Sequence, residues 1–454
     1  MEEGKDLIHD VIVIGAGAAG LKATGDLLKG GLKRVLLLES RDRVGGRIFS
    51  KQLECGSWIE YGANWQARTH QDNLEELIQD FKFEKTETFR KGKSVMWEPT
   101  GEKKLVSFDS SGMSLLGLAD AALFFLYLYR RCSGVNFDSP IQGNAKYDNM
   151  TAEDFINSSM WTNDAKKRVR VALEGGVCRN LKEISVLSLV HFLKTVPTTS
   201  TDEVDCYYLT GGLQNLLKRY SEAFKDNIRF NSKVLHIDSS SSPISVTTES
   251  KETYKAKKIV LAFPPPLLTR IKFEPPLPEG YELTAKTQVC GRVLKLVGEF
   301  KTPWWRSRGF CGKIVSFTEK FMDEAYDISH EKAGVLAGFV VGDRALEVVK
   351  LGKEELTKRF NDFMAECFGK GGEPLKELHY HNWLADDDTV AAYSSVPNLG
   401  MWKHHSKGYF HSTGPIYFAG TEYSQSWTGL MEGALESGKQ VAERILKANE
   451  LQQE

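Results

Sequence analysis

Apolar residues in the first forty positions follow the period of a buried strand, then that of a helix, then a strand again. Four consecutive apolar residues, 11–14, predict a buried strand, and the segment RVLLLES at 34–40 predicts a second one. Between them, from Leu21 to Leu28, apolar residues recur at helical spacing. A strand, a helix and a strand in this order are typical of an α/β fold with a parallel sheet.

The pattern changes twice farther along the chain. Residues 70–200 have mixed helical periodicity, and residues 205–275 are strand-like. The remaining predicted elements are a strand at 292–300, a helix at 353–367, short strands at 379–383 and 416–420, and a closing helix at 429–448. The most apolar stretch, 115–131, is short for a membrane span and contains Asp120, which favours a core helix over a membrane contact.

Composition places the chain among ordinary globular proteins. It has 454 residues, 41% of them apolar and 26% charged, with a net charge of −1. That balance argues against a nucleic-acid partner recognised by bulk charge. Seven cysteines, an odd number with no CxxC pair, indicate reduced thiols in an intracellular protein. With neither a signal peptide nor a membrane anchor in the pattern, we expect a cytoplasmic location; the oligomeric state stays open.

A glycine motif joins the first strand to the first helix. Gly15, Gly17 and Gly20 have the spacing GxGxxG, which allows a tight turn, a close approach of a pyrophosphate to the backbone, and close helix–strand packing. The helix N-terminus adds free N–H groups and a positive dipole. Glu39, nineteen residues after Gly20, can hold the ribose hydroxyls of an adenosine and would repel a 2′-phosphate. FAD and NAD share this motif.

The next segment, RDRVGGR at 41–47, surrounds a second glycine pair with arginines that could clamp a diphosphate. Together with the strand and the acid, it makes the dinucleotide prediction strong. A further glycine-containing segment follows the predicted strand at 416–420. Because the two glycine motifs lie at opposite ends of the chain, we expect the fold to bring both ends to one cofactor site.

Three polar features of the sequence need a separate interpretation: one lysine, a histidine pair and an acidic run. Lys295 lies inside the apolar strand pattern at 292–300, where a charge is costly without a function; an outward-facing lysine on an edge strand is the alternative. His379 and His381 could share one face of a strand, but no third ligand is near, so we expect core or solvent-facing histidines and no metal site. The acidic run 386–388 reads as a solvated loop.

Several segments resemble the flavin-containing amine oxidases, which include monoamine and polyamine oxidases. They are RDRVGGR, EYGANW at 60–65, the proline-rich segment at 261–278, and IYFAGTEYSQSW with GLMEGALESG at 416–438. The resemblance runs from residue 10 to 446. It implies an α/β fold in which a Rossmann-like FAD-binding domain is interleaved with a substrate-binding domain. The FAD-binding domain would comprise 8–70, 205–270 and 400–450, and the substrate-binding domain 71–204 and 271–399.

The resemblance also assigns roles to residues. The opening loop would hold FAD, without NAD, and Ala392 stands where animal monoamine oxidases carry the flavin-linking cysteine, so FAD should be non-covalent. Lys295, ten residues before Trp305, would hold a water against flavin N5. Tyr393, ten residues after Trp383, would form one wall of an aromatic cage; a core tyrosine is the alternative. The implied cofactor-binding residues are Gly15, Ala16, Gly17, Gly20, Glu39, Arg41, Gly46, Arg47, Ala63, Asn64, Trp65, Val234, Trp383, Gly420, Glu422, Leu430 and Met431.

The implied function is an FAD-dependent amine oxidase that consumes O2, releases H2O2 and converts an amine to an imine and then an aldehyde. Leu430 replaces the second aromatic wall of the cage, and Ala67 replaces the His or acid usual in polyamine oxidases. The segments AYSSVP and GANW nevertheless favour a polyamine-like substrate. The alternatives are a monoamine oxidase for arylalkyl amines and a flavin-bearing ligand-binding protein with little turnover.

Overall fold

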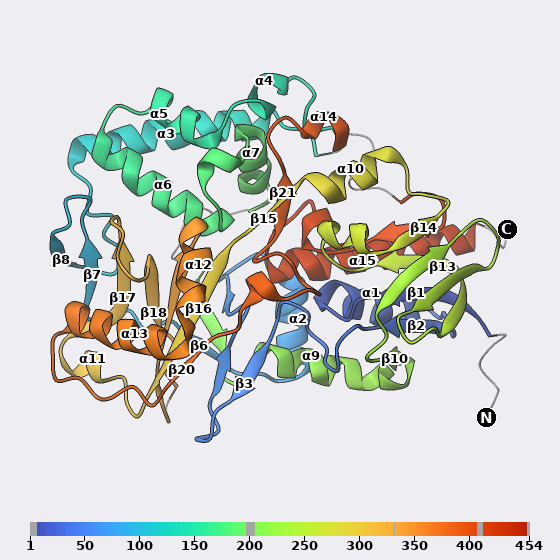
Figure 1. Ribbon diagram of the computed structural model, residues 1–454, viewed down its shortest axis with the longest axis horizontal. Helices are drawn as coiled ribbons and strands as arrows, with labels where there is room; N and C mark the ends of the chain where they lie inside the picture. Colours follow the sequence, from blue (N-terminus) through green and yellow to red (C-terminus); the bar gives the residue numbers. More distant parts are fainter. Residues whose placement is uncertain (1–6, 138, 197–204, 331, 406–411, 452–454) are drawn as a thin grey trace.

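Two large β-sheets, three small ones and a helical layer make up the described part of the molecule (Figure 1). The computed structural model describes residues 7–137, 139–196, 205–330, 332–405 and 412–451. The predicted α/β class is confirmed. In Figure 1 the eight-stranded sheet lies on the right, the seven-stranded sheet on the left, and the helical layer above the latter.

The eight-stranded sheet contains the predicted N-terminal strands. Its order is β10-β2-β1-β13-β12-β11-β14, and β22 pairs with β13 beyond this path. The bounds are β10 Ile228–Arg229, β2 Val35–Leu38, β1 Ile8–Ile14, β13 Thr253–Leu261, β12 Ile244–Thr248, β11 Val234–Asp238, β14 Lys272–Glu274 and β22 Ile416–Phe418. β1 lies parallel to both β2 and β13, and β22 is parallel to β13. Its central strands are buried on both faces, as continuous apolar runs require.

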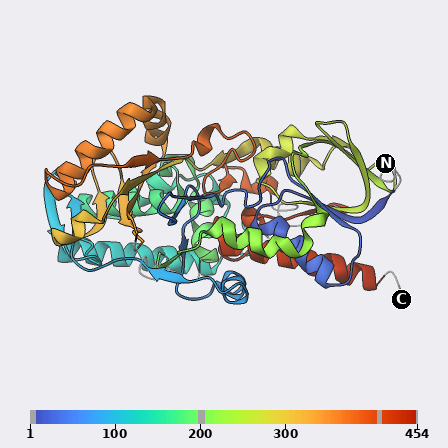
Figure 2. The same ribbon diagram turned by 90° about the horizontal axis from the view of Figure 1, so that it is seen from below.

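Both ends of the described chain meet at this sheet. Helix α1 (Ala18–Lys29) packs along helix α15 (Met431–Glu450), and Figures 1 and 2 show the blue and red helices side by side. Gly438 permits this packing, because a Cβ there would lie 2.2 Å from the carbonyl oxygen of Ala19. The prediction that the chain ends come together is confirmed.

The seven-stranded sheet has the order β20-β16-β19-β18-β17-β7-β8. The bounds are β20 Glu377–His379, β16 Val293–Phe300, β19 Gly334–Val341, β18 Glu324–Asp327, β17 Phe310–Ser316, β7 Lys93–Trp97 and β8 Lys103–Val106. β16, the strand of Lys295, pairs with β19 and β20, so the edge-strand alternative for this lysine is wrong. The expectation of a mainly helical 70–200 segment is confirmed for the described residues, and β7 and β8 are short strands within it. Helix α13 (Gly352–Phe368) confirms the prediction at 353–367.

Short pairings connect the layers near the cavity. β3 (Ser50–Gln52) pairs with β4 (Trp58–Glu60), and β9 (Tyr207–Leu209) lies between β5 (Trp65–Gln66) and β6 (Lys85–Glu87). Other elements near the cavity are β15 Gln288–Cys290, β21 Ser395–Pro397, α2 Asp72–Asp80, α9 Leu213–Ser221, η3 Pro265–Arg270, η5 Trp383–Ala385 and η6 Thr421–Tyr423. These pieces carry side chains from distant segments toward one place.

The helical layer consists of α3 (Leu115–Ser133), α5 (Ala152–Ser159), α6 (Asn163–Val177) and α7 (Val186–Thr195). The expectation of a core helix at 115–131 is only partly confirmed, because one face of the helix is buried and the other is exposed. Phe124 and Leu128 pack into the layer, whereas Leu116 and Leu126 are about 60% exposed. The helix is apolar all round, but described elements cover only one side of it. No helix in the described ranges is both long and apolar enough to cross a membrane.

Candidate active site

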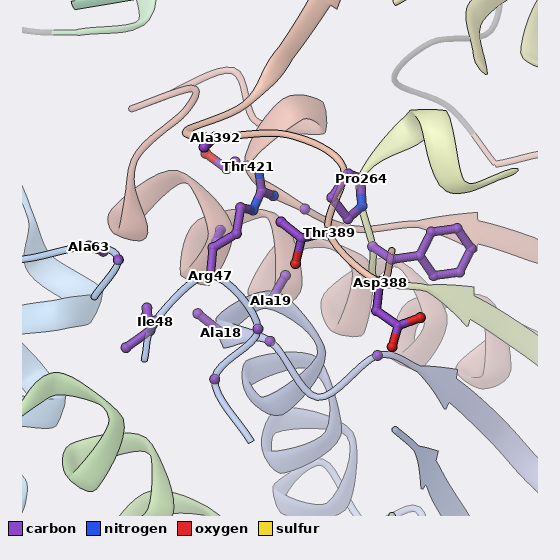
Figure 3. A pocket seen from close by; sticks show the side chains of 18 of the residues that line it. Ala18, Ala19, Arg47, Ile48, Ala63, Pro264, Asp388, Thr389, Ala392 and Thr421 are labelled. Carbon is purple, nitrogen blue, oxygen red and sulfur yellow. The ribbon is translucent and has the colours of Figure 1, made fainter. Parts of the chain in front are cut away.

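Residues from both ends of the chain line one deep cavity between the two sheets. The N-terminal segment contributes the glycine turn and Arg47, and the C-terminal segment contributes Thr421 and Leu430. Figure 3 shows Ala18, Ala19, Arg47 and Ala63 around the same space as Thr421 and Ala392. The arrangement is an elongated trough that extends from the glycine turn to Tyr393.

The glycine turn fits a dinucleotide. A Cβ on Gly17 would meet nothing within 4 Å, so the backbone there is open to a ligand. Gly15 has φ +104°, and a Cβ on Gly20 would lie 1.9 Å from the carbonyl oxygen of Gly15. These two glycines are therefore required by the tight turn and by helix packing, and Gly17 by access to the backbone.

Glu39 fixes the edge of the glycine turn. Its carboxylate is 4% exposed and accepts hydrogen bonds from the backbone N–H groups of Ala16 at 2.6 Å and Arg41 at 3.0 Å. The side chain also lines the cavity. Ser40 Oγ also donates to Glu39 at 3.2 Å. A carboxylate has about four acceptor positions, so Glu39 keeps capacity for one hydroxyl in the cavity.

Arg47 crosses the cavity to the C-terminal segment. Its guanidinium donates to both carboxylate oxygens of Glu422, at 2.6 and 3.0 Å. The same group donates to the carbonyl oxygen of Tyr393. Arg47 lines the cavity, but Glu422 is buried behind it. Glu422 thus positions the arginine that faces the ligand.

Lys295 is a buried cation in the wall of the cavity. Its ammonium donates to the carbonyl oxygen of Gly62 at 3.1 Å and to Oδ1 of Asn64 at 3.3 Å, and lies 5.4 Å from the centre of the Trp65 ring. Burial lowers its pKa to about 7, opposed by the nearby Glu60 carboxylate. Burial likewise raises the pKa of Glu60 to about 7. Lys295 can therefore exchange a proton at neutral pH.

Aromatic side chains enclose the same end of the trough. Tyr393, Trp65 and Phe339 line it, and the Trp65 ring lies edge-on to Tyr326 at 5.6 Å between centres. Burial raises the pKa of Tyr393 well above its usual value, so its hydroxyl stays neutral. Trp383 is held by a hydrogen bond from its indole N–H to the carbonyl oxygen of Tyr61 at 2.9 Å. Hydrogen-bonded aromatic walls give the site a dry, fixed shape.

Two acidic residues that the sequence patterns did not indicate lie at this aromatic end of the cavity. Asp205 lines the cavity, and Glu324 accepts a hydrogen bond from the Tyr326 hydroxyl at 3.0 Å. Burial raises the pKa of Asp205 to about 7, and the charge of Glu324 acts in the same direction. Burial also raises the pKa of Glu324. Isolated acids in irregular or short elements carry no periodic signal, so only the fold brings this pair together.

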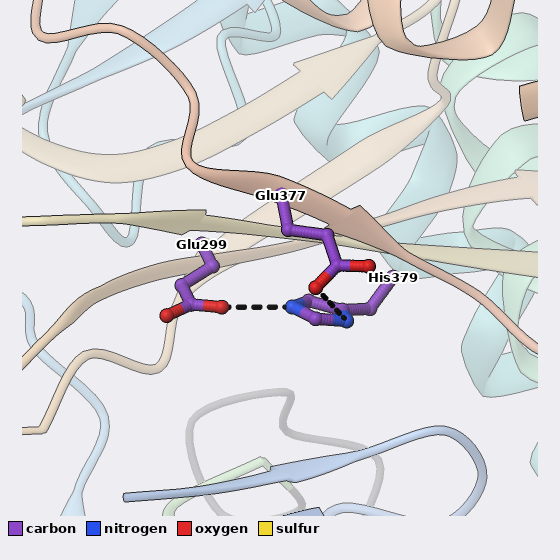
Figure 4. Close-up of side chains that lie close together, drawn as sticks. All are labelled: Glu299, Glu377 and His379. Atoms are coloured by element: carbon purple, nitrogen blue, oxygen red, sulfur yellow. Dashed lines mark hydrogen bonds and ion pairs between the residues drawn. The ribbon is translucent and has the colours of Figure 1, made fainter. Parts of the chain in front are cut away.

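The histidines at 379 and 381 point to different partners. His381 lies 3.0 Å from Asp386, whereas His379 lies between Glu299 at 2.9 Å and Glu377 at 3.7 Å (Figure 4). Lysines already bind these carboxylates. The pairs are Lys376 with Glu299 at 2.8 Å, Lys353 with Glu377 at 2.8 Å and Lys51 with Glu377 at 3.9 Å. A cation could bind only by displacing them, so the cluster is an ion-pair network beneath the sheet.

The cavity brings together nearly all of the residues predicted for the site. Lys295, Tyr393 and the predicted cofactor-binding residues line it, apart from Ala16, Gly20 and Glu422, which lie behind the wall. Residues missed by the sequence reasoning also line it, among them Gln71, Asp205, Lys233, Phe339, Asp388, Thr389 and Thr421. The expectation of a solvated run at 386–388 holds for Asp387, which is 83% exposed, and is wrong for Asp386 and Asp388, which form less exposed ion pairs. Their basic partners lie far away in sequence.

Comparisons with known proteins agree with this site. The family model of flavin containing amine oxidoreductases matches residues 18–446. Flavin-containing amine oxidase B of Sus scrofa is 27% identical over 466 residues, covering 97% of this chain and 86% of its own. The Homo sapiens protein of that name is 27% identical over 467 residues with the same coverage.

Solved structures share the fold. Putrescine oxidase in a complex with putrescine superimposes with a TM-score of 0.90 at 24% identity, over 97% of this chain and 99% of its own. Cyclohexylamine oxidase from Brevibacterium oxydans has a TM-score of 0.90 at 22% identity, over 98% and 100%. The glycine turn, the cavity built by both chain ends and the family match thus lead to one conclusion: the chain belongs to the flavin-containing amine oxidoreductases, enzymes that oxidise amines.

Proposed function

We propose that this enzyme is an oxidase of diamines or polyamines that binds FAD non-covalently and passes electrons to O2, releasing H2O2. FAD, when bound, accepts a hydride equivalent from the carbon next to the amine nitrogen, and the resulting imine hydrolyses to an aldehyde. Ala392, beside the cage tyrosine, offers no nucleophile for a covalent link. The cytoplasmic location and the discontinuous two-domain division belong to the same proposal.

The observation that carries the substrate class is a row of side chains across the seven-stranded sheet. Lys295 on β16 pairs with Phe339 on β19, and Phe339 pairs with Glu324 on β18. Directly paired residues of antiparallel strands project from the same face. The row therefore extends from the cation at one end to a carboxylate two strand spacings away, about 10 Å along the sheet.

This spacing suits a substrate with two amino groups. One amine would sit neutral beside Tyr393 and Lys295, where its α-carbon must face the flavin. The distal ammonium would reach Asp205, which lines the cavity, and would extend past the lining to Glu324, which accepts the hydrogen bond of Tyr326. A bound ammonium lowers the pKa of these acids and is in turn held by charge-assisted hydrogen bonds. The similarly folded putrescine oxidase, whose structure contains putrescine, gives the proposal further support.

The protein's own residues supply orientation and a dry site. Tyr393 and Trp65 form the walls against which the alkyl chain packs, and Asn64 holds the Lys295 ammonium. Lys295 lines the same end of the cavity and, because burial lowers its pKa, would give or take a proton there. No strong general base is required for a hydride transfer from a neutral amine.

The aromatic walls favour arylalkyl amines as a second candidate class. Phe339 and Trp65 would stack against a flat ring, and Leu430 leaves one side of the cage open. In that case Glu324 would serve only to hold the Tyr326 hydroxyl.

An amine panel with a matched pair of variants separates the two. Glu324→Gln should lower kcat/KM for 1,4-diaminobutane and spermidine by about 10- to 150-fold, since a hydrogen bond to a charged group is worth about 1.5–3 kcal/mol. Tyramine and benzylamine should change by less than threefold. Glu319→Gln, at an exposed acid remote from the cavity, is the control. Preference for tyramine with no selective loss would support the arylalkyl class, and no peroxide with any amine would support a ligand-binding protein.

A further inference from the structure

The three consecutive aspartates at 386–388 meet three basic side chains from three separate segments. Asp386 pairs with Arg41, which follows β2, and Arg41 also donates to Thr389 Oγ1 at 2.8 Å. Asp387 lies 3.3 Å from Arg270 at the end of η3. Asp388 lies 2.9 Å from Lys233, the residue before β11.

All three cations belong to the eight-stranded sheet or its connections, whereas the aspartates belong to the loop between η5 and Tyr393. Arg41, Lys233 and Arg270 line the cavity, as do Asp388 and Thr389. In Figure 3 the chain that carries Asp388, Thr389 and Ala392 lies on the opposite side of the cavity from Ala18 and Ala19. The loop therefore spans the trough near Glu39 and Val234, the predicted adenosine end.

The pairs differ in how well they are protected from water. The Asp386 carboxylate is 11% exposed, receives further hydrogen bonds from His381 at 3.0 Å and from the backbone N–H of Asp388 at 3.0 Å, and has the tightest contact. The Asp388 side chain is 27% exposed and that of Asp387 is 83% exposed. Exposed ion pairs contribute little to stability, whereas removal of one partner from a buried pair leaves an unpaired buried charge and is strongly destabilising.

We propose that residues Asp386–Thr389 form an electrostatic clasp that closes the adenosine end of the cofactor trough and sets the rate at which FAD leaves. The proposal rests on the proposed function in assuming that FAD occupies this trough. Opening the loop requires the three ion pairs to separate. The C-terminal end of the loop leads within four residues to Ala392 and Tyr393. The clasp thereby connects cofactor retention to the wall of the substrate site.

The clasp predicts that removal of an aspartate speeds FAD release, whereas simple charge repulsion predicts slower release. The sign of the change therefore tests the proposal. An aspartate that lines a site for a pyrophosphate repels it, so its removal should slow FAD release if only that repulsion matters. The clasp predicts faster release instead. Asp386→Asn should accelerate release more than tenfold, Asp388→Asn threefold to tenfold, and Asp387→Asn less than twofold.

The experiment dilutes each holoenzyme and records the rise of free FAD fluorescence, with melting temperature as a check on folding. Asp343→Asn removes an exposed acid paired with Lys182 and Arg292 outside the cavity and serves as the control. Asp388→Lys should also accelerate release, and combining it with Lys233→Asp should restore the wild-type rate.

Unchanged or slower release in Asp386→Asn and Asp388→Asn, with normal melting temperatures, would overturn the clasp. Failure of the proposed function looks different. A flavin that stays with the denatured polypeptide, or a wild-type protein that binds no FAD, would contradict the cofactor assignment itself.

Discussion

Replacement of Lys295 by methionine tests the centre of the proposed mechanism. Lys295 is 4% exposed, and its ammonium has two oxygen acceptors; methionine keeps most of the side-chain length and removes the ammonium. A preorganised charge beside developing negative charge is worth about 3–4 kcal/mol, so the affected step should slow by about 10²- to 10³-fold. Burial lowers the pKa of this lysine, so the charged fraction at neutral pH is smaller than for an exposed lysine and the loss should lie toward the lower end of that range.

The variant should still fold. Glu60 lies near enough to Lys295 for their charges to interact, and a buried charge left without its counterpart costs about 3–5 kcal/mol. Glu60 avoids most of that cost, because burial already raises its pKa to about 7 and loss of the lysine raises it further, so the carboxyl protonates. It also keeps hydrogen bonds from Ser50 Oγ and the backbone N–H of Leu213, both at 2.7 Å.

Stopped-flow absorbance separates the two half-reactions. Anaerobic bleaching of the flavin by the amine measures reduction, and the return of absorbance on mixing with O2 measures reoxidation. Lys258→Met, at a lysine in β13 outside the cavity, controls for loss of a strand lysine. If both rates of Lys295→Met stay within about twofold of wild type, a barrier change below about 0.5 kcal/mol, the reasoning is refuted.

Three further predictions follow from the same site. Glu39→Ala should weaken FAD binding by about 2–4 kcal/mol in a fluorescence titration, since it removes charge-assisted hydrogen bonds and the acceptor of the Ala16 N–H; unchanged affinity would contradict the ribose assignment. Leu430→Tyr should raise the ratio of kcat/KM for tyramine to that for 1,4-diaminobutane, and a constant ratio would place residue 430 outside the substrate wall. Stability should also depend on the buried pair. Between pH 4.5 and 7 the native chain binds a proton at Glu60 that the unfolded chain has lost, so this contribution to the free energy of unfolding falls as pH rises. Between pH 7 and 10.5 the unfolded chain binds the extra proton, at Lys295, so the contribution rises. Urea unfolding of wild type relative to Glu60→Gln/Lys295→Met should show this minimum near pH 7, and a flat difference would contradict the assigned pKa values.

The sequence predicted those parts of the fold that depend on neighbouring residues. The runs around Val11 and Lys295 have the periods of buried strands, and the structure places both inside sheets. The glycine motifs predicted a site that both chain ends build, because each has a backbone requirement that can be recognised locally.

What the sequence did not predict depends on partners distant along the chain. Asp386 pairs with Arg41, 345 positions away in sequence. Because this partner cannot be recognised locally, the three aspartates predicted a solvated loop. Asp205 and Glu324 meet only through the fold. The apolar residues of α3 predicted burial, but local periodicity does not reveal whether another element covers the outer face.

The meeting of the two chain ends also has a consequence for protein synthesis. β22 and α15, which complete the sheet and the cavity, are the last described elements to leave the ribosome, whereas β1 and α1 are among the first. Because domains fold as units during translation, the N-terminal glycine turn must wait for nearly the whole chain before its packing partners exist. A nascent chain halted before residue 416 therefore lacks the elements that close the trough, and cofactor loading must await the synthesis of β22 and α15.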